Sequence, residues 1–139
     1  VVAYTDDKTD PQYKYCEETL SALEKATDAK GRKLIIHKLM LPRPVLTLSE
    51  SESKGLTNTA YTLVKREPGR RLAASYVNYY QGEDFIILPA FGVKEDELAY
   101  KEIQSLYPNK KIHQINTREI LLGGGNIHCI TMQIPSRGE

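Results

Sequence analysis

An order of strand, helix and strand that occurs twice restricts the fold of this chain more than any other feature of its sequence. The first copy covers residues 1–41 and the second covers residues 85–115. Elements in this order form a βαβ-like unit. Two such units in one chain are typical of a modular αβ architecture, so we predict the α/β (α+β) class.

The first copy contains a strong signal for the start of a helix. Residues 1–5 are rich in β-formers, and Asp10-Pro11 then supplies an N-cap and a first helical residue, where proline loses no useful donor. Side chains on one face recur at three- and four-residue spacing up to Gly31, which we expect to end the helix. This stripe consists of Tyr13, Cys16, Leu20, Leu23 and Thr27. We interpret Cys16 as a packing residue, and residues 34–41 as the second strand.

A predicted β-hairpin precedes the helix of the second copy. Residues 72–80 and 85–88 favour strands, and residues 81–84 favour the turn between them. The segment 89–95 then leads into a helix that ends before Pro108. Its apolar positions are Leu98, Ala99, Ile103 and Leu106. Residues 111–115 predict a further strand, after which residues 118–122 lead to a run of glycines.

The segment 42–70 has no sustained apolar period. Serine, proline and charged residues dominate it. A loop of this length inside a compact domain is usually functional or flexible. Two interpretations have equal weight, namely a solvated excursion and a segment that gates access to a substrate.

Composition argues against several classes of partner and cofactor. The 19 basic and 18 acidic residues leave a net charge of +1, which gives no electrostatic case for nucleic acid or an anionic membrane. No apolar run reaches the roughly 18 residues of a membrane helix. Cys16, Cys129, His37, His113 and His128 lack metal-ligand spacing, so we expect no metal and no cofactor. Two separated cysteines favour a reducing cytoplasm over a disulfide framework.

Residues 121–135, LLGGGNIHCITMQIP, form the candidate functional segment. Three consecutive glycines suggest a turn with positive φ angles or a ligand against bare backbone. From Ile127 onward, alternation predicts a strand with His128 on an apolar face and Cys129 on a polar face. Although most strand cysteines are small core residues, a thiol just after a glycine turn is suited to nucleophilic attack. His128 would point away from Cys129 and is not expected to be its base.

The string Gly-Gly-Gly-Asn-Ile-His-Cys-Ile-Thr, followed by Gln and Pro, resembles the C-terminal signature of the agmatine deiminases, which belong to the guanidino-group-modifying (pentein) superfamily. Upstream segments resemble the same family in the same order: Thr5-Asp6-Asp7 with Asp10-Pro11-Gln12, residues 71–78 (RLAASYVN), and Pro89-Ala90-Phe91. The resemblance covers nearly the whole chain. It implies a five-bladed αβ propeller, with residues 1–139 as the C-terminal portion of one catalytic domain and about its last two blades.

The resemblance also implies a hydrolase that acts on linear amidines. The Cys129 thiolate would attack the guanidinium carbon of agmatine, ammonia would leave, and water would release N-carbamoylputrescine on the route to putrescine and polyamines. Asn78, Gly124 and Gly125 are the implied substrate-binding residues, the glycines chiefly as backbone room. The alternative for Asn78 is a polar residue at a strand end, and the alternative substrate is peptidylarginine. We expect a small guanidino ligand and a homo-oligomer.

Part of the family's chemistry would lie outside this sequence. Residue 1 is not an initiator methionine and residues 1–4 already have strand character, so we expect a longer polypeptide. The substrate-gripping carboxylates and the family's Gly-His-x-Asp segment would precede Val1. The isolated piece is therefore expected to need the N-terminal part of its parent chain for activity. The other class of function that stays open is a non-catalytic αβ module. We interpret Asp6 and Asp7 as part of a solvated turn rather than as contacts to the cationic tail of a substrate.

Overall fold

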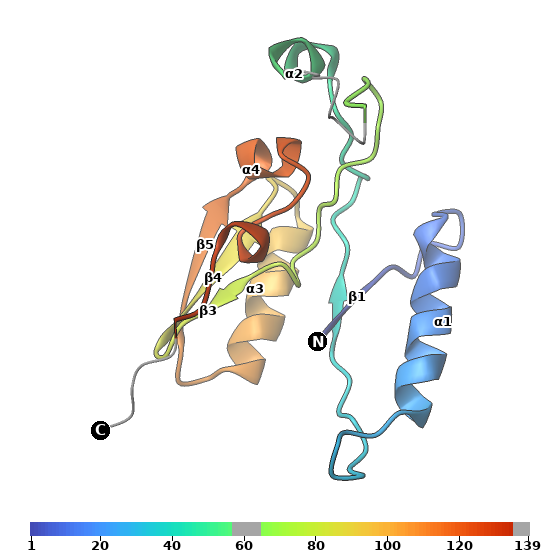
Figure 1. Cartoon of the computed structure of the whole chain (residues 1–139), viewed down its shortest axis with the longest axis vertical. Coiled ribbons are helices and arrows are strands. Elements are labelled where there is room, and N and C mark those ends of the chain that lie inside the picture. The colour runs from blue at the N-terminus through green and yellow to red at the C-terminus, as the bar shows by residue number, and fades with distance from the viewer. Residues whose placement is uncertain (57–64, 135–139) are drawn as a thin grey trace.

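The computed structural model describes residues 1–56 and 65–134 (Figure 1). It is a mixed α/β structure with two small sheets, as predicted. One sheet pairs β1 (Val2–Tyr4) with β2 (Lys38–Met40) in parallel. The other has the order β3-β4-β5, in which β4 (Phe85–Ala90) pairs antiparallel with β3 (Tyr80–Gln81) and parallel with β5 (Lys111–Asn116). Both predicted strand, helix and strand units are confirmed.

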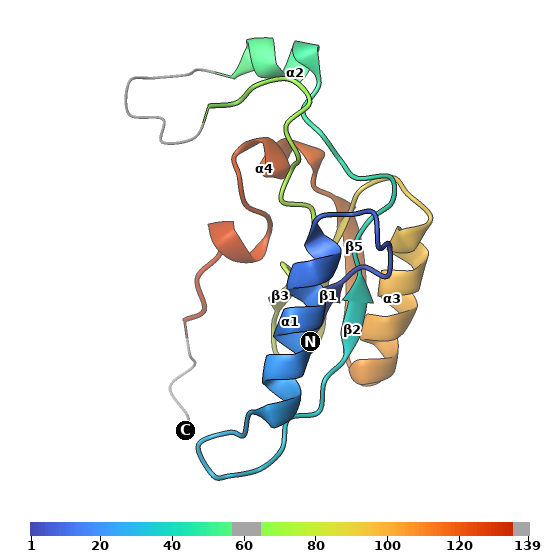
Figure 2. The ribbon, with the colours of Figure 1, turned by 90° about the vertical axis from the view of Figure 1, so that its right-hand side faces the viewer.

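In the first unit, the helix α1 (Gln12–Lys25) connects β1 to β2. It begins one residue later than predicted, at Gln12, with Pro11 in place of Asp10 as the N-cap. Asp10 still stabilises this start, because its Oδ1 accepts a hydrogen bond from the Gln12 backbone N–H at 2.8 Å. The end of the helix comes earlier than Gly31, because Ala26 is already extended. Figure 1 shows α1 on the outer side of the unit, and Figure 2 shows it in front of β1, with β2 visible beside it. The second predicted strand is shorter than expected, since only Lys38–Met40 of residues 34–41 joins the ladder.

The second unit contains the helix α3 (Glu95–Leu106) between β4 and β5. The Asp96 carboxylate fixes its first turn by accepting hydrogen bonds from the backbone N–H groups of residues 91–93, at 2.8 to 3.2 Å. Ile86, Leu88 and Ile103 are completely buried. Because α3 also contacts β2, it packs against strands of both sheets, and the two units share one core.

The strand predicted over residues 72–80 is wrong except for its last residue, since only Tyr80–Gln81 forms a strand. Long-range contacts hold the rest of this segment. The Leu72 N–H donates to the Leu46 carbonyl at 2.8 Å, and the buried Tyr76 hydroxyl donates to Asp96 at 2.7 Å. The apolar pattern of the segment therefore reflects packing against other parts of the core and not a ladder.

The strand predicted from Ile127 onward is also wrong. Ile127 has helical dihedral angles, and His128–Ile130 form the 3₁₀ turn η1. Backbone bonds from Cys129 to Asn126, from Ile130 to Ile127 and from Thr131 to His128 occupy the donors that a ladder would need. His128 is consequently exposed, and so are Met132 and Ile134.

The segment 42–70 contains a short helix, α2 (Glu50–Gly55), which Figures 1 and 2 show at one end of the molecule. Ser49 and Glu52 form a capping box, since each side chain accepts a hydrogen bond from the other residue's backbone N–H. The helix α4 (Arg118–Leu122) lies beside this end. Among the described residues, no helix has the length and apolar character needed to cross a bilayer.

Candidate active site

Cys129 and Asn78 lie together although 51 positions separate them in the sequence. Asn78 Nδ2 donates a hydrogen bond to Cys129 Sγ at 3.1 Å, and the Cys129 N–H donates to Asn78 Oδ1 at 3.3 Å. The Asn78 backbone carbonyl also accepts from the His128 N–H at 3.3 Å. Asn78 therefore holds both the sulfur and the backbone of the turn that carries it, and the side chain of Cys129 remains exposed.

These contacts favour the thiolate. The pKa of Cys129 is lowered, first because of the hydrogen bond from the Asn78 side chain and second because of a backbone hydrogen bond at Asn126. A donor aimed at sulfur stabilises the charged form more than the neutral form. Since the thiolate is the nucleophilic species, this environment makes Cys129 a better nucleophile than an ordinary surface cysteine. Cys16, by contrast, is buried on α1 as predicted, with its sulfur 3.7 Å from the Ala3 carbonyl.

A buried asparagine anchors the turn from the inside. Asn126 is completely buried, and its Nδ2 donates to Thr117 Oγ1 at 3.0 Å while its Oδ1 accepts from the Ile127 N–H at 2.8 Å. Its backbone carbonyl accepts from the Cys129 N–H at 2.9 Å. Thr117 is tied in turn to the end of β4, because its N–H donates to the Ala90 carbonyl at 3.2 Å. Asn126 was not among the residues predicted from the sequence, although a polar residue directly after three glycines was the available signal.

The glycines before the turn have protein neighbours. A Cβ atom on Gly125 would lie 2.7 Å from Cys129 Cβ and 3.0 Å from its sulfur. Gly124 has a φ of +98°, and a Cβ atom there would lie 2.5 Å from Arg66 Nη2. The structure thus places Gly125 directly against Cys129, and Gly124 against the side chain of Arg66. Their contact with substrate stays a prediction.

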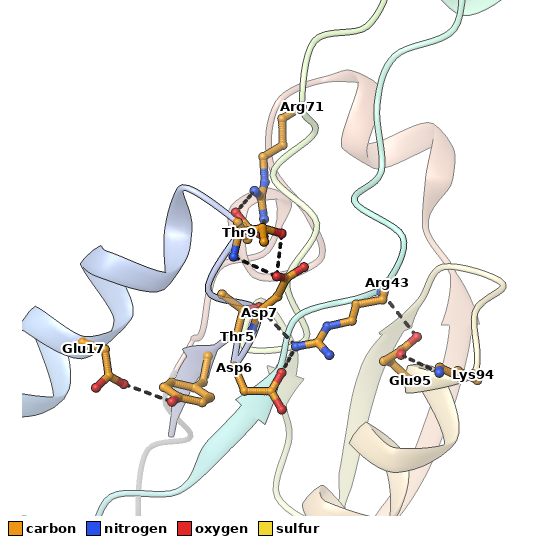
Figure 3. Close-up of polar contacts among 11 residues, drawn as sticks. Thr5, Asp6, Asp7, Thr9, Glu17, Arg43, Arg71, Lys94 and Glu95 are labelled. Atoms are coloured by element: carbon orange, nitrogen blue, oxygen red, sulfur yellow. Dashed lines mark hydrogen bonds and ion pairs between the residues drawn. The ribbon is translucent and has the colours of Figure 1, made fainter.

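The two aspartates after β1 have partners within the protein (Figure 3). Asp6 forms an ion pair with Arg43, whose backbone N–H donates to Glu95 at 3.3 Å. Asp7 accepts hydrogen bonds from the N–H and the hydroxyl of Thr9, at 2.9 and 2.7 Å. These contacts account for both carboxylates as parts of a stabilised turn.

The described residues supply an exposed thiol with a lowered pKa, but no histidine or carboxylate among them is hydrogen-bonded to it. Cys129 accepts a hydrogen bond from Asn78 and donates to Asn78 and Asn126, and no histidine in residues 1–56 or 65–134 is its partner. Nor do these residues contain a group of three or more side chains suited to hold a metal ion. A cavity of about 540 Å³ lies elsewhere, between α1 and residues 71–75, and none of the predicted site residues lines it.

Several known proteins, all longer than this chain, contain a segment similar to it. A family model described as Porphyromonas-type peptidyl-arginine deiminase matches residues 1–135. A Listeria monocytogenes protein named "Putative agmatine deiminase 1" is 53% identical over 134 residues, which are 96% of this chain and 36% of that protein. A solved agmatine deiminase of Enterococcus faecalis matches with a TM-score of 0.88 and 39% identity, over 98% of this chain and 36% of its own. A solved agmatine deiminase of C. jejuni matches with a TM-score of 0.59 and 25% identity, over 91% of this chain and 32% of its own. The chain therefore spans little more than a third of the length of the curated relatives it matches.

Proposed function

Because this chain belongs to the Porphyromonas-type peptidyl-arginine deiminase family, we propose that it supplies the nucleophile to an active site that hydrolyses agmatine to N-carbamoylputrescine and ammonia. The resemblance of its sequence to the agmatine deiminases is confirmed by relatives that carry this name. The observation that carries the proposal is the exposed Cys129 thiol, whose pKa is lowered by the Asn78 amide at 3.1 Å.

The proposed reaction proceeds in two halves around Cys129. Its thiolate sulfur forms a bond to the guanidinium carbon, one amino group takes a proton, and the C–N bond to that group breaks to release ammonia. Water then adds to the same carbon of the amidino-cysteine intermediate and gives up two protons in the course of this half, one of which restores the group that protonated the departing amine. Breakage of the C–S bond returns the thiolate and releases N-carbamoylputrescine. A bound guanidinium cation also lowers the thiol pKa further by favouring the charged form.

Cys129 and Asn78 cover only part of this chemistry. A cationic substrate needs carboxylates that hold it, and the departing ammonia needs a proton donor. We assign these groups to a longer protein that we call the full-length polypeptide, in which this chain would correspond to the 36% of the Listeria relative that it matches. The two βαβ units then correspond to about two blades of a five-bladed propeller. Their repeated order of elements supports this assignment.

Peptidylarginine is the second candidate substrate, and the description of the matching family favours it. The names of the more similar relatives favour agmatine instead. The two substrates differ at the far end of the alkyl chain that bears the guanidino group, since agmatine has a free amine there and a peptide has a bulky backbone. We therefore propose comparing kcat/KM for agmatine and for a short arginine-containing peptide.

The direct test measures ammonia release from agmatine by the full-length polypeptide, by its Cys129→Ser variant and by its Cys16→Ser variant. We expect the first substitution to abolish turnover and the second to preserve it, because Cys16 is a buried packing residue. A non-catalytic module would release no ammonia in any of the three forms. Turnover that survives Cys129→Ser would overturn the assignment of the nucleophile.

A further inference from the structure

A bidentate ion pair joins the segment 42–70 to α4, the helix that precedes the glycine turn. Arg118, the first residue of α4, directs Nε and Nη2 to the two carboxylate oxygens of Glu52, at 2.7 and 2.8 Å. Its Nη2 also donates to the Thr47 carbonyl at 2.7 Å. The two side chains are 29% and 20% exposed, so the pair is partly shielded from water. Planar bidentate pairs of this kind fix geometry as well as charge.

A second contact joins the same segment to the turn itself. Arg66 Nη2 donates to the Gly123 carbonyl at 2.9 Å. The backbone carbonyl of Arg66 accepts from the Ser53 hydroxyl at 2.6 Å. Ser53 belongs to α2, directly after Glu52. The guanidinium also lies where a side chain at Gly124 would have to be, because a Cβ atom there would be 2.5 Å from Nη2. A residue without a side chain at position 124 thus allows the contact.

These contacts lie at the two ends of a very short helix. α4 has 5 residues, far fewer than the 12 to 15 or so that an isolated helix needs to be stable in water. Its position therefore depends on packing of the buried Leu121 and Leu122 and on the contacts at Arg118 and Gly123. Gly125 then follows within the same turn and lies against Cys129. A shift of α4 would move the sulfur relative to Asn78.

We propose that Glu52, Arg66 and Arg118, the clamp residues, are positioning residues for Cys129, because they fasten the segment 42–70 to α4 and the glycine turn and so maintain the contact between Asn78 and the sulfur. This assigns the segment a role other than a solvated excursion or a gate. The expected effect on agmatine turnover rests on the proposed function, whereas the expected effect on the pKa and alkylation of the Cys129 thiol does not.

The test measures the rate at which iodoacetamide alkylates Cys129 as a function of pH in the full-length polypeptide, with the adduct quantified by mass spectrometry. Arg66→Met removes the donor to Gly123. Glu52→Gln removes the charge of the ion pair but keeps a residue that can form the capping box. Both variants are expected to alkylate about three- to tenfold more slowly at pH 7, with a midpoint at higher pH, because the thiolate loses its aligned donor. Agmatine turnover should show a lower kcat with little change in KM.

Matched controls separate positioning from general destabilisation. Arg70→Met removes a guanidinium of the same segment that donates to the Lys65 carbonyl, and Glu97→Gln removes an exposed ion pair on α3. Neither control should change the alkylation midpoint. Arg66→Lys should restore part of the wild-type rate, because an ammonium group can still donate to the Gly123 carbonyl.

The other possible results test the positioning role and the proposed deiminase function separately. Unchanged midpoints and kcat in both clamp variants, or equal shifts in clamp variants and controls, would overturn the positioning role. If Glu52→Gln does not fold, Arg66→Met alone decides it. A wild-type protein that releases no ammonia, but whose clamp variants still shift the midpoint, supports the positioning role while the proposed function fails.

Discussion

Asn78 contacts Cys129 with both ends of its amide, through Nδ2 to the sulfur at 3.1 Å and through Oδ1 to the backbone N–H at 3.3 Å. One side chain thus lowers the pKa of the thiol and orients the turn that carries it. This double contact makes the substitution of Asn78 informative, because the two functions can be removed separately.

Asn78→Asp keeps the acceptor for the Cys129 N–H but replaces the donor to the sulfur with a carboxylate oxygen. We expect the pKa of Cys129 to rise by about one unit or more, since a donor is lost and a like charge is introduced. The measurement is the pH midpoint of Cys129 alkylation. Asn109→Asp, at an exposed position, is the control and should leave the midpoint unchanged. A midpoint that stayed in place in Asn78→Asp would show that the amide does not control the thiol.

Thr117→Val removes the hydroxyl that accepts from Asn126 Nδ2 and keeps nearly the same shape. The buried amide is then left without this acceptor, so the free energy of unfolding should fall by about 1–3 kcal/mol. Urea denaturation of the full-length polypeptide measures the loss. Combining Thr117→Val with Asn126→Ala should cost less than the sum of the single substitutions, because both remove one interaction. Strict additivity would contradict the contact.

Gly125→Ala places a methyl group where only 2.7 Å separates it from Cys129 Cβ. We expect turnover to fall by about tenfold or more, well beyond any loss of stability, because the thiol must move away from Asn78. Gly124→Ala should also disturb the turn, because alanine is strained at a φ of +98° and its Cβ atom would clash with Arg66. Gly55→Ala is the control, since a Cβ atom there meets nothing within 4 Å. Equal turnover and melting in Gly125→Ala and Gly55→Ala would show that the close approach has no catalytic consequence.

Glu52 gives the stability of the protein a defined pH dependence. Hydrogen bonds from Arg118, and then from Ser49, lower its pKa from 4.5 to about 2. A carboxyl with a lower pKa in the folded state stabilises that state above its unfolded pKa and loses the contribution as pH falls through the folded pKa. The difference in unfolding free energy between wild type and Glu52→Gln should therefore be constant above about pH 5.5 and shrink as pH falls toward 2. Urea titrations at several pH values test this, with the exposed Glu50→Gln as the control. A difference that increased toward low pH would contradict it.

The 139-residue chain on its own is expected to release no ammonia from agmatine, whereas the full-length polypeptide does. The reason is chemical, because the described residues bring neither a histidine nor a carboxylate into hydrogen-bond contact with Cys129. Both proteins would be assayed at equal concentration, with Cys129→Ser in the full-length polypeptide as the blank. Turnover by the shorter chain that depends on Cys129 would mean that it carries its own proton donor.

The sequence predicted the elements whose patterns are local. The helix α3 has apolar spacing and ends before Pro108 as predicted, and β4 and β5 extend the predicted strands 85–88 and 111–115 by only one or two residues. The same reasoning failed for residues 72–80, where Leu72 and Tyr76 are buried by contacts with Leu46 and Asp96 rather than by a ladder. The apolar periodicity of a sequence indicates which side chains are buried, but it does not indicate which residues they pack against.

The candidate site was accessible to sequence reasoning only in part. The resemblance pointed to both Cys129 and Asn78, whose roles stay predictions, but no spacing rule predicts a contact across 51 positions. The contacts of Arg66 and Arg118 depend equally on how a segment without periodicity folds back. The 3₁₀ turn at His128–Ile130 was missed because local i to i+3 bonds outweighed the strand-like alternation of its side chains.

The separation of 51 residues between Asn78 and Cys129 also has a consequence during synthesis. At the usual rate of translation, about 3 to 10 seconds pass between the two residues. Until the glycine turn folds onto Asn78, the nascent thiol has the weak acidity of any cysteine in an unfolded chain. The lowered pKa of Cys129 is therefore a property of the folded chain alone, because it arises only when Asn78 and the glycine turn have come together.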